Sequence, residues 1–161
     1  MKQDHPVAGS RWVHESILLG VGLFILALAL SAAFVPQLRL LHFFQALIYV
    51  VLIILTRRNS AWGFGVGVFI AAAWNSLNLF VTHLFQAGAG QFWSLLHTGH
   101  VSRPDTLMVV VGGVGHFVLI IGCMAGFLQQ RPSAKHWGQF VGGGLLALAY
   151  LGMIVATTAP R

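Results

Sequence analysis

The chain has 161 residues, of which 57% are hydrophobic and only 7% are charged. About a quarter of the residues in a soluble globular domain are charged, so this composition excludes an ordinary soluble domain. The formal net charge is +6, but no basic stripe carries interleaved aromatic residues. The positive excess therefore fits anionic lipid headgroups and argues against nucleic acid as a partner.

Apolar runs long enough to cross a bilayer occur five times, at residues 16–35, 38–56, 61–85, 106–130 and 137–158, and the only charge within them is Arg39 at the start of the second. A hydrocarbon core of about 30 Å needs about 20 apolar residues in helical form. Backbone amides in lipid must find partners within their own segment, and no alternating strand pattern suggests a barrel. The sequence predicts an all-α integral membrane protein, with residues 1–161 forming a single transmembrane domain of five helices.

Lysine and arginine in the short connections predict the orientation of the chain in the membrane. One side would hold six of the nine: Lys2, Arg11, Arg57, Arg58, Arg131 and Lys135. The other side would hold Arg39, Arg103 and Arg161. We expect a plasma (bacterial inner) membrane protein whose amino terminus is cytoplasmic and whose carboxyl terminus is external.

The connections 57–60 and 131–136 are very short, which predicts antiparallel hairpins from the second and third spans and from the fourth and fifth. The two hairpins, 38–85 and 106–158, also resemble each other. His42-Phe43 matches His116-Phe117, and Trp62-Gly63 matches Trp137-Gly138. A parallel repeat about an axis along the membrane normal is one explanation. The other is the small amino-acid alphabet that all membrane helices share.

The longest connection, 86–105, is expected outside the membrane, with one or two helical turns at "QFWSLLH". His97 and His100, with His83 and Asp105 nearby in the sequence, are weak candidates for a zinc or copper site. Gly99 interrupts any helical presentation of the two histidines. Solvated loop histidines are the simpler interpretation.

Small residues recur at helical spacing in the last three spans, and each of these spans contains a GxxxG sequence, which is typical of close helix packing. The predicted faces comprise Gly63, Gly67, Ala71, Asn78 and Thr82; Gly112, Gly115, His116, Leu119, Gly122, Cys123 and Gly126; and Gly138, Gly142, Leu145, Ala149, Gly152 and Ala156. These faces serve packing within one subunit or contact in a homo-oligomer. In either case His116 is expected to point inward.

Polar residues in four of the five spans fall at a similar predicted depth, in the outer third of the membrane. They are His42, Gln45, Tyr49, Asn75, Asn78, Thr82, His116 and Tyr150. Because an unpaired polar group in hydrocarbon costs several kcal/mol, such side chains face one another or a cavity. Hydrogen bonds between helices, a ligand pocket open to the outside, and a haem site that uses His42 and His116 are all compatible with this pattern.

Catalysis has little support, since the only acids, Asp4, Glu15 and Asp105, lie outside the predicted spans and give no carboxylate pair. His116 is about 10 Å from Cys123 along a helix, too far for a thiolate–imidazole pair. We therefore expect a non-catalytic binding or accessory subunit with a polar pocket in the outer leaflet, and favour no cofactor. A b-type haem electron carrier and an oligomeric channel or carrier are the alternatives. Expected partners are the lipid bilayer and a homo-oligomer or larger membrane complex.

Overall fold

The computed structural model describes residues 11–158. These residues form helices and connecting turns, with no strand among them. In chain order the elements are α1 (Arg11–Phe34), the short 3-10 helix η1 (Pro36–Leu38), α2 (Arg39–Arg57), α3 (Ala61–Ser76), the π-helical turn η2 (Leu77–Val81), α4 (Leu84–Thr98), α5 (Pro104–Gln129) and α6 (Ala134–Thr158).

Within the described residues, five helical segments are long and apolar enough to cross a membrane, as predicted. They are Arg11–Phe34, Pro36–Arg57, Ala61–Val81, Pro104–Gln129 and Ala134–Thr157. Four of them begin earlier than the predicted spans, because the flanking polar residues continue the helix. Leucines, phenylalanines and valines cover much of their outer surfaces, which suits a hydrocarbon solvent.

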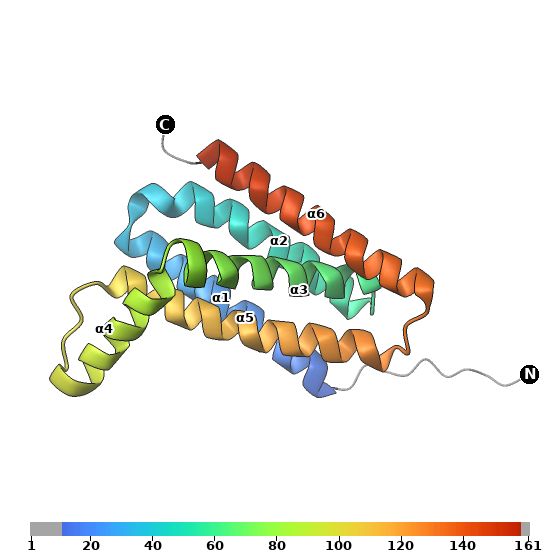
Figure 1. Ribbon diagram of the computed structural model, residues 1–161, viewed down its shortest axis with the longest axis horizontal. Coiled ribbons are helices and arrows are strands. Elements are labelled where there is room, and N and C mark those ends of the chain that lie inside the picture. Colours follow the sequence, from blue (N-terminus) through green and yellow to red (C-terminus); the bar gives the residue numbers. More distant parts are fainter. Residues whose placement is uncertain (1–10, 159–161) are drawn as a thin grey trace, which may run out of the picture.

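The helices form a bundle in which α1 lies along α5 and α3 lies along α6. The third helix, α3, also packs on α2 and α5, so it lies between three of the long helices (Figure 1). Its sequence suits this position, since Gly63, Gly65, Gly67 and Ala71 are buried and present almost no side chain. The core beside it is aromatic and aliphatic, with Phe64 and Phe127 fully enclosed.

The two closest helix pairs meet at glycines. A Cβ atom on Gly115 of α5 would lie 2.7 Å from the backbone oxygen of Gly20 on α1. A Cβ on Gly143 of α6 would collide with the backbone of Trp62, and one on Gly65 with the backbone of Phe140. Small residues at these positions let the backbones approach.

The predicted packing face of the fourth span is correct, and His116 points inward with no exposed surface. The face predicted for the last span is wrong. Gly138 and Gly152 have open space around them, and the buried stripe of α6 is instead Phe140, Gly143, Gly144, Ala147, Leu151 and Ile154. The GxxxG spacing did not identify this stripe, because the aromatic and aliphatic residues between the glycines decide which side of α6 faces the bundle.

The two predicted hairpins are not equivalent. α2 and α3 pack against each other. α5 and α6 touch near their connection, where Phe127 stacks on Phe140 at 4.4 Å and meets Trp137 at 4.7 Å. Beyond this cluster α6 continues along α3 instead. The predicted pairing of the last two spans is therefore limited to their turn, and the internal repeat is not confirmed.

The basic turns do gather at one end of the bundle. Gln130 Nε2, next to the α5–α6 turn, donates a hydrogen bond of 2.5 Å to the backbone oxygen of Asn59 in the α2–α3 turn. Lys2 and Arg161, which also entered the orientation argument, lie outside the described residues. Which end faces the cytoplasm stays a prediction.

The third span ends before the predicted boundary at residue 85. After α3 the chain makes one wide turn, in which the Thr82 amide donates to the oxygen of Leu77 at 2.9 Å. His83 then adopts a left-handed conformation with φ of 55°. The chain turns into α4, a helix of 15 residues that packs on α5 and projects from one end of the bundle (Figure 1). Most of the predicted external loop 86–105 is therefore helical.

Candidate functional site

A cavity of about 400 Å³ lies where α1 ends, α2 begins, η2 ends, α5 begins and α6 ends. Most of its wall is apolar, from residues such as Phe24, Leu28 and Val109. A minority of polar side chains interrupts this wall: Ser31, His42, Gln45, Asn78, Thr82, Asp105 and Thr106. A largely apolar hollow of this size with a few polar groups is typical of small-molecule sites.

Three of the polar residues form a hydrogen-bonded chain across α1 and α2. His42 Nδ1 lies 2.8 Å from Gln45 Oε1, and His42 Nε2 lies 3.1 Å from Ser31 Oγ. An amide oxygen only accepts, so Nδ1 carries the proton and Nε2 accepts from the serine hydroxyl. This tautomer follows from the orientation of the Gln45 amide. In this orientation the amide nitrogen of Gln45 is left for another partner.

Asn78 and Thr82 belong to the broken end of the third span. Asn78 Nδ2 donates to the backbone oxygen of Trp74 at 2.9 Å, and Thr82 Oγ1 donates to Asn78 Oδ1 at 3.4 Å. The Leu84 amide in turn donates to Thr82 Oγ1 at 3.4 Å. Asn78 and Thr82 thus bond to each other and to backbone groups on both sides of the break, and polar partners of this kind are what a helix break at membrane depth requires.

Asp105 also lines the cavity, although the sequence argument placed it in an external loop. Pro104 begins α5, and Asp105 is therefore in the first turn of that helix. Its carboxylate accepts a hydrogen bond of 3.2 Å from Arg103 Nη2, and its side chain is 30% exposed. The prediction that no acid lies within a span is wrong for Asp105, because the spanning helix starts at Pro104 and not at residue 106.

A second polar group lies deeper, between α2, α3 and α5. Tyr49 and His116 are joined by a hydrogen bond of 2.6 Å, and His116 Nδ1 lies 3.3 Å from Asn75 Oδ1. Asn75 Nδ2 points the other way, 3.5 Å from the oxygen of Gly113. Its Oδ1 therefore accepts from Nδ1, and the tyrosine hydroxyl donates to Nε2. All three residues are buried.

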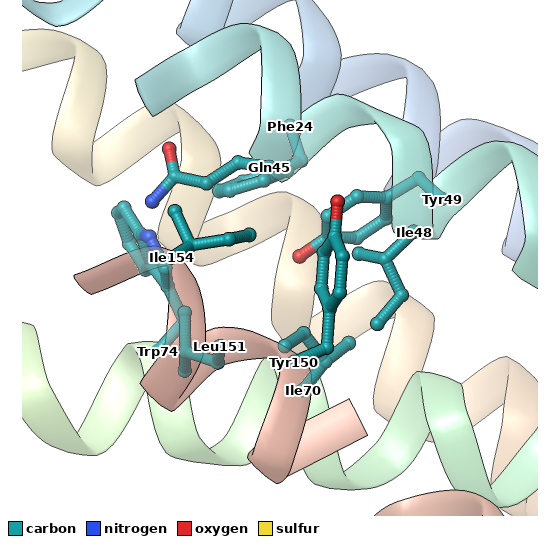
Figure 2. A pocket seen from close by; sticks show the side chains of 9 residues that line it. All are labelled: Phe24, Gln45, Ile48, Tyr49, Ile70, Trp74, Tyr150, Leu151 and Ile154. Atoms are coloured by element: carbon teal, nitrogen blue, oxygen red, sulfur yellow. The ribbon is translucent and has the colours of Figure 1, made fainter. Parts of the chain in front are cut away.

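Phe24 separates this buried triad from the cavity. Its ring stacks on His116 with centroids 4.0 Å apart, and it also lines the cavity wall. A smaller hollow, large enough for about one water molecule, lies beside it (Figure 2). Tyr150 lines that hollow and donates a hydrogen bond of 2.7 Å to the backbone oxygen of Phe44. It does not reach the larger cavity.

The predicted polar layer thus divides into two groups. His42, Gln45, Asn78 and Thr82 meet in the large cavity, whereas Tyr49, Asn75 and His116 bond to one another below it. Tyr150 stands apart from both, although Gln45 and Tyr49 line the same small hollow.

This division argues against a haem held by His42 and His116. His42 bonds to Ser31 on α1, while His116 stacks on Phe24 of α1 and bonds to Tyr49 of α2. Ser31 and Phe24 are seven residues apart on α1, and His42 and Tyr49 are seven residues apart on α2. Seven residues correspond to about 10 Å along a helix. The predicted equal depth of the two histidines is therefore wrong. Both ring nitrogens of His116 also already have partners, so these residues do not fit axial ligation.

His97 and His100 are both exposed at the end of α4. His97 Nδ1 bonds to the backbone oxygen of Trp93 at 2.9 Å, and its ring lies against the indole ring of Trp93. Within residues 11–158 no three histidine, cysteine or acidic side chains come close enough to hold a metal ion. The zinc or copper hypothesis gains no support from this arrangement.

Sequence reasoning missed Ser31, Phe24, Trp74 and Asp105 as cavity residues. Serine and aromatic residues are common in membrane helices, so nothing in the local pattern marks the first three. Asp105 did carry a signal. Proline is favoured at the first position of a helix, and an acid in the first turn complements the helix dipole, so "RPD" is a helix start.

The comparisons with known proteins add no assignment to this geometry. No family model matches the chain, and no curated protein or solved structure is significantly similar to it.

Proposed function

We propose that this chain is a multi-pass membrane protein of the plasma membrane that binds a small, largely apolar molecule in the cavity between its five long helices. The cavity is the observation that carries the proposal. It has apolar walls from all five helices, and its few polar groups lie where α1 and η2 end and where α2 and α5 begin. Such a site would hold a ligand by burying its apolar body and orienting it through one polar group.

Among the described residues the cavity carries no reactive constellation, which supports a binding role over a catalytic one. In the cavity the one acid is paired with Arg103, and His42 uses both ring nitrogens in hydrogen bonds. The single cysteine, Cys123, is fully buried in the helix bundle away from the cavity. A ligand-binding or accessory subunit fits these features, with a homo-oligomer or a larger membrane complex as its setting.

Photoaffinity labelling tests the proposal. The protein in lipid nanodiscs is irradiated with an octyl diazirine alcohol, and the labelled residues are mapped by mass spectrometry. We expect saturable labelling of cavity residues such as Val109. Val155→Trp, which places an indole at the cavity wall, should abolish it. Val141→Trp is the control, because Val141 is on the same helix with 43% exposure against 48% for Val155, and does not line the cavity.

Non-saturable labelling spread over outward residues such as Leu19 and Leu146, which are 56% and 63% exposed, would refute a cavity site. Labelling that is saturable but equal in both tryptophan variants would also refute it. The carrier alternative has its own readout: solute uptake into proteoliposomes that the Val155→Trp variant blocks would replace a binding role with a transport role.

A further inference from the structure

The hydrogen bonds at the cavity wall narrow the class of ligand. Resting on the proposed function above, we infer that the cavity recognises a neutral molecule with an apolar body and a hydrogen-bond-accepting oxygen, such as a ketone, ester or quinone carbonyl, and that the amide nitrogen of Gln45 is its principal donor.

The first support is the donor-to-acceptor direction of the series of hydrogen bonds that ends at Gln45. Ser31 donates to His42 Nε2, and His42 Nδ1 donates to Gln45 Oε1. The oxygen of Gln45 is thereby occupied, and its Nε2 keeps two N–H groups. Hydrogen bonds arranged in series polarise one another, so the end of the chain is a better donor than an isolated amide.

The second support is that this donor is not enclosed by protein and that its side chain lines the cavity. Every fully enclosed side-chain nitrogen or oxygen among the described residues has a hydrogen-bond partner. Gln45 Nε2 has no such partner within residues 11–158, and neither has the indole nitrogen of Trp74. Neither atom is therefore fully enclosed by protein. Gln45 and Trp74 line both the large cavity and the small one, so they stand where the two meet.

Figure 2 shows the same arrangement from close by. The amide of Gln45 extends from α2 with its nitrogen turned in the direction of the Trp74 ring, among apolar neighbours that include Leu151 and Ile154. Two N–H donors in otherwise apolar surroundings match an accepting oxygen. They do not match an ammonium group, which brings only donors.

Charge does not favour an ionic ligand. Among residues 11–158 the carboxylate of Asp105 is the one acid on the wall, and Arg103 already contacts it at 3.2 Å. The pair is partly exposed, so its net field in the cavity is weak. A bare carboxylate ligand would meet the charge of Asp105, and an amine would have to share that carboxylate with Arg103, which already contacts Oδ2. A neutral acceptor meets neither penalty.

Competition against the diazirine label tests the inference with four octyl compounds: methyl octyl ketone, octane, octylamine and octanoate. We expect the ketone to compete best. In Gln45→Met the ketone should lose about two- to tenfold in apparent affinity, the range of one neutral hydrogen bond, while octane is unchanged. Gln37→Met is the matched control, since Gln37 is exposed at the same end and does not line the cavity.

Infrared difference spectra of an isotope-labelled ketone carbonyl give a readout that affinity alone cannot. A hydrogen-bonded carbonyl stretch shifts to lower frequency in the wild type and returns towards its apolar value in Gln45→Met. The inference fails if octylamine competes best and loses its advantage in Asp105→Asn, or if Gln45→Met leaves both the ketone affinity and its spectrum unchanged. In either case saturable labelling would leave the proposed binding function standing. If the diazirine label itself does not saturate, the binding function fails first.

Discussion

Removing the tyrosine hydroxyl from the buried triad is the sharpest test of the packing beneath the cavity. In Tyr49→Phe the ring is kept, so the packing volume hardly changes. His116 Nε2 loses its 2.6 Å hydrogen bond and has no other partner. Leaving a fully buried acceptor unsatisfied costs about 1–3 kcal/mol, and His116 has no exposed surface through which water could compensate.

Tyr150→Phe is the matched control. It also deletes one tyrosine hydroxyl, whose bond to the Phe44 backbone oxygen is 2.7 Å, but this bond lies at the exposed side of the bundle. We expect a loss of about 0.5–1 kcal/mol there, the net value of an ordinary hydrogen bond. The free energy of unfolding is measured by reversible denaturation in mixed micelles with increasing sodium dodecyl sulfate.

A double-mutant cycle separates this hydrogen bond from general disturbance. His116→Leu removes the acceptor, so Tyr49→Phe should cost much less in that background than in the wild type. The coupling free energy is expected in the range of about 0.5–3 kcal/mol that contacting residues show. Equal costs for Tyr49→Phe and Tyr150→Phe, or a coupling of zero, would refute the buried network.

Two further predictions concern the helix contacts and the orientation. Gly115→Ala should destabilise the protein by about 1–3 kcal/mol, because its Cβ would lie 2.7 Å from a backbone oxygen of α1. Gly22→Ala, with open space around it, should be neutral or stabilising by up to about 1 kcal/mol. Equal thermal stabilities of the two variants would disprove the close contact. With the predicted orientation, a membrane-impermeant maleimide should label Ser102→Cys in intact cells but Ser133→Cys only after permeabilisation. Both sites are exposed, and the native Cys123 is buried and should not react. The reverse labelling pattern would show the opposite orientation.

The number and approximate position of the spanning helices could be predicted because they depend on one quantity, the length of an uncharged run. The inward face of α5 was also predictable, since Gly112, His116 and Cys123 share a face through the 3.6-residue period alone. The face of α6 was not. Its glycines offer two possible stripes, and the choice depends on Phe140 packing beside Gly65 of α3, a contact between distant parts of the sequence.

The candidate site was predictable in composition more than in geometry. The prediction placed His42 and His116 at the same depth by counting residues from the turns. Equal residue counts give equal heights only when the helices have the same tilt and starting level, and here the two levels differ. Their partners on α1, Ser31 and Phe24, show that they occupy different levels. Asp105 entered the cavity for a related reason, since α5 starts two residues before the predicted span.

The polar stretch after Trp74 explains why the cavity lies at this end of the bundle. An uninterrupted helix to residue 85 would need no asparagine or threonine there. The observed chain leaves the α-helix at Leu77, where Asn78 donates to the Trp74 backbone oxygen and Thr82 accepts from the Leu84 amide. Irregular backbone at membrane depth is stable only where it is enclosed by protein or lines a cavity. Here it does line one, and the residues of the break supply two of the polar side chains on its wall, Asn78 and Thr82.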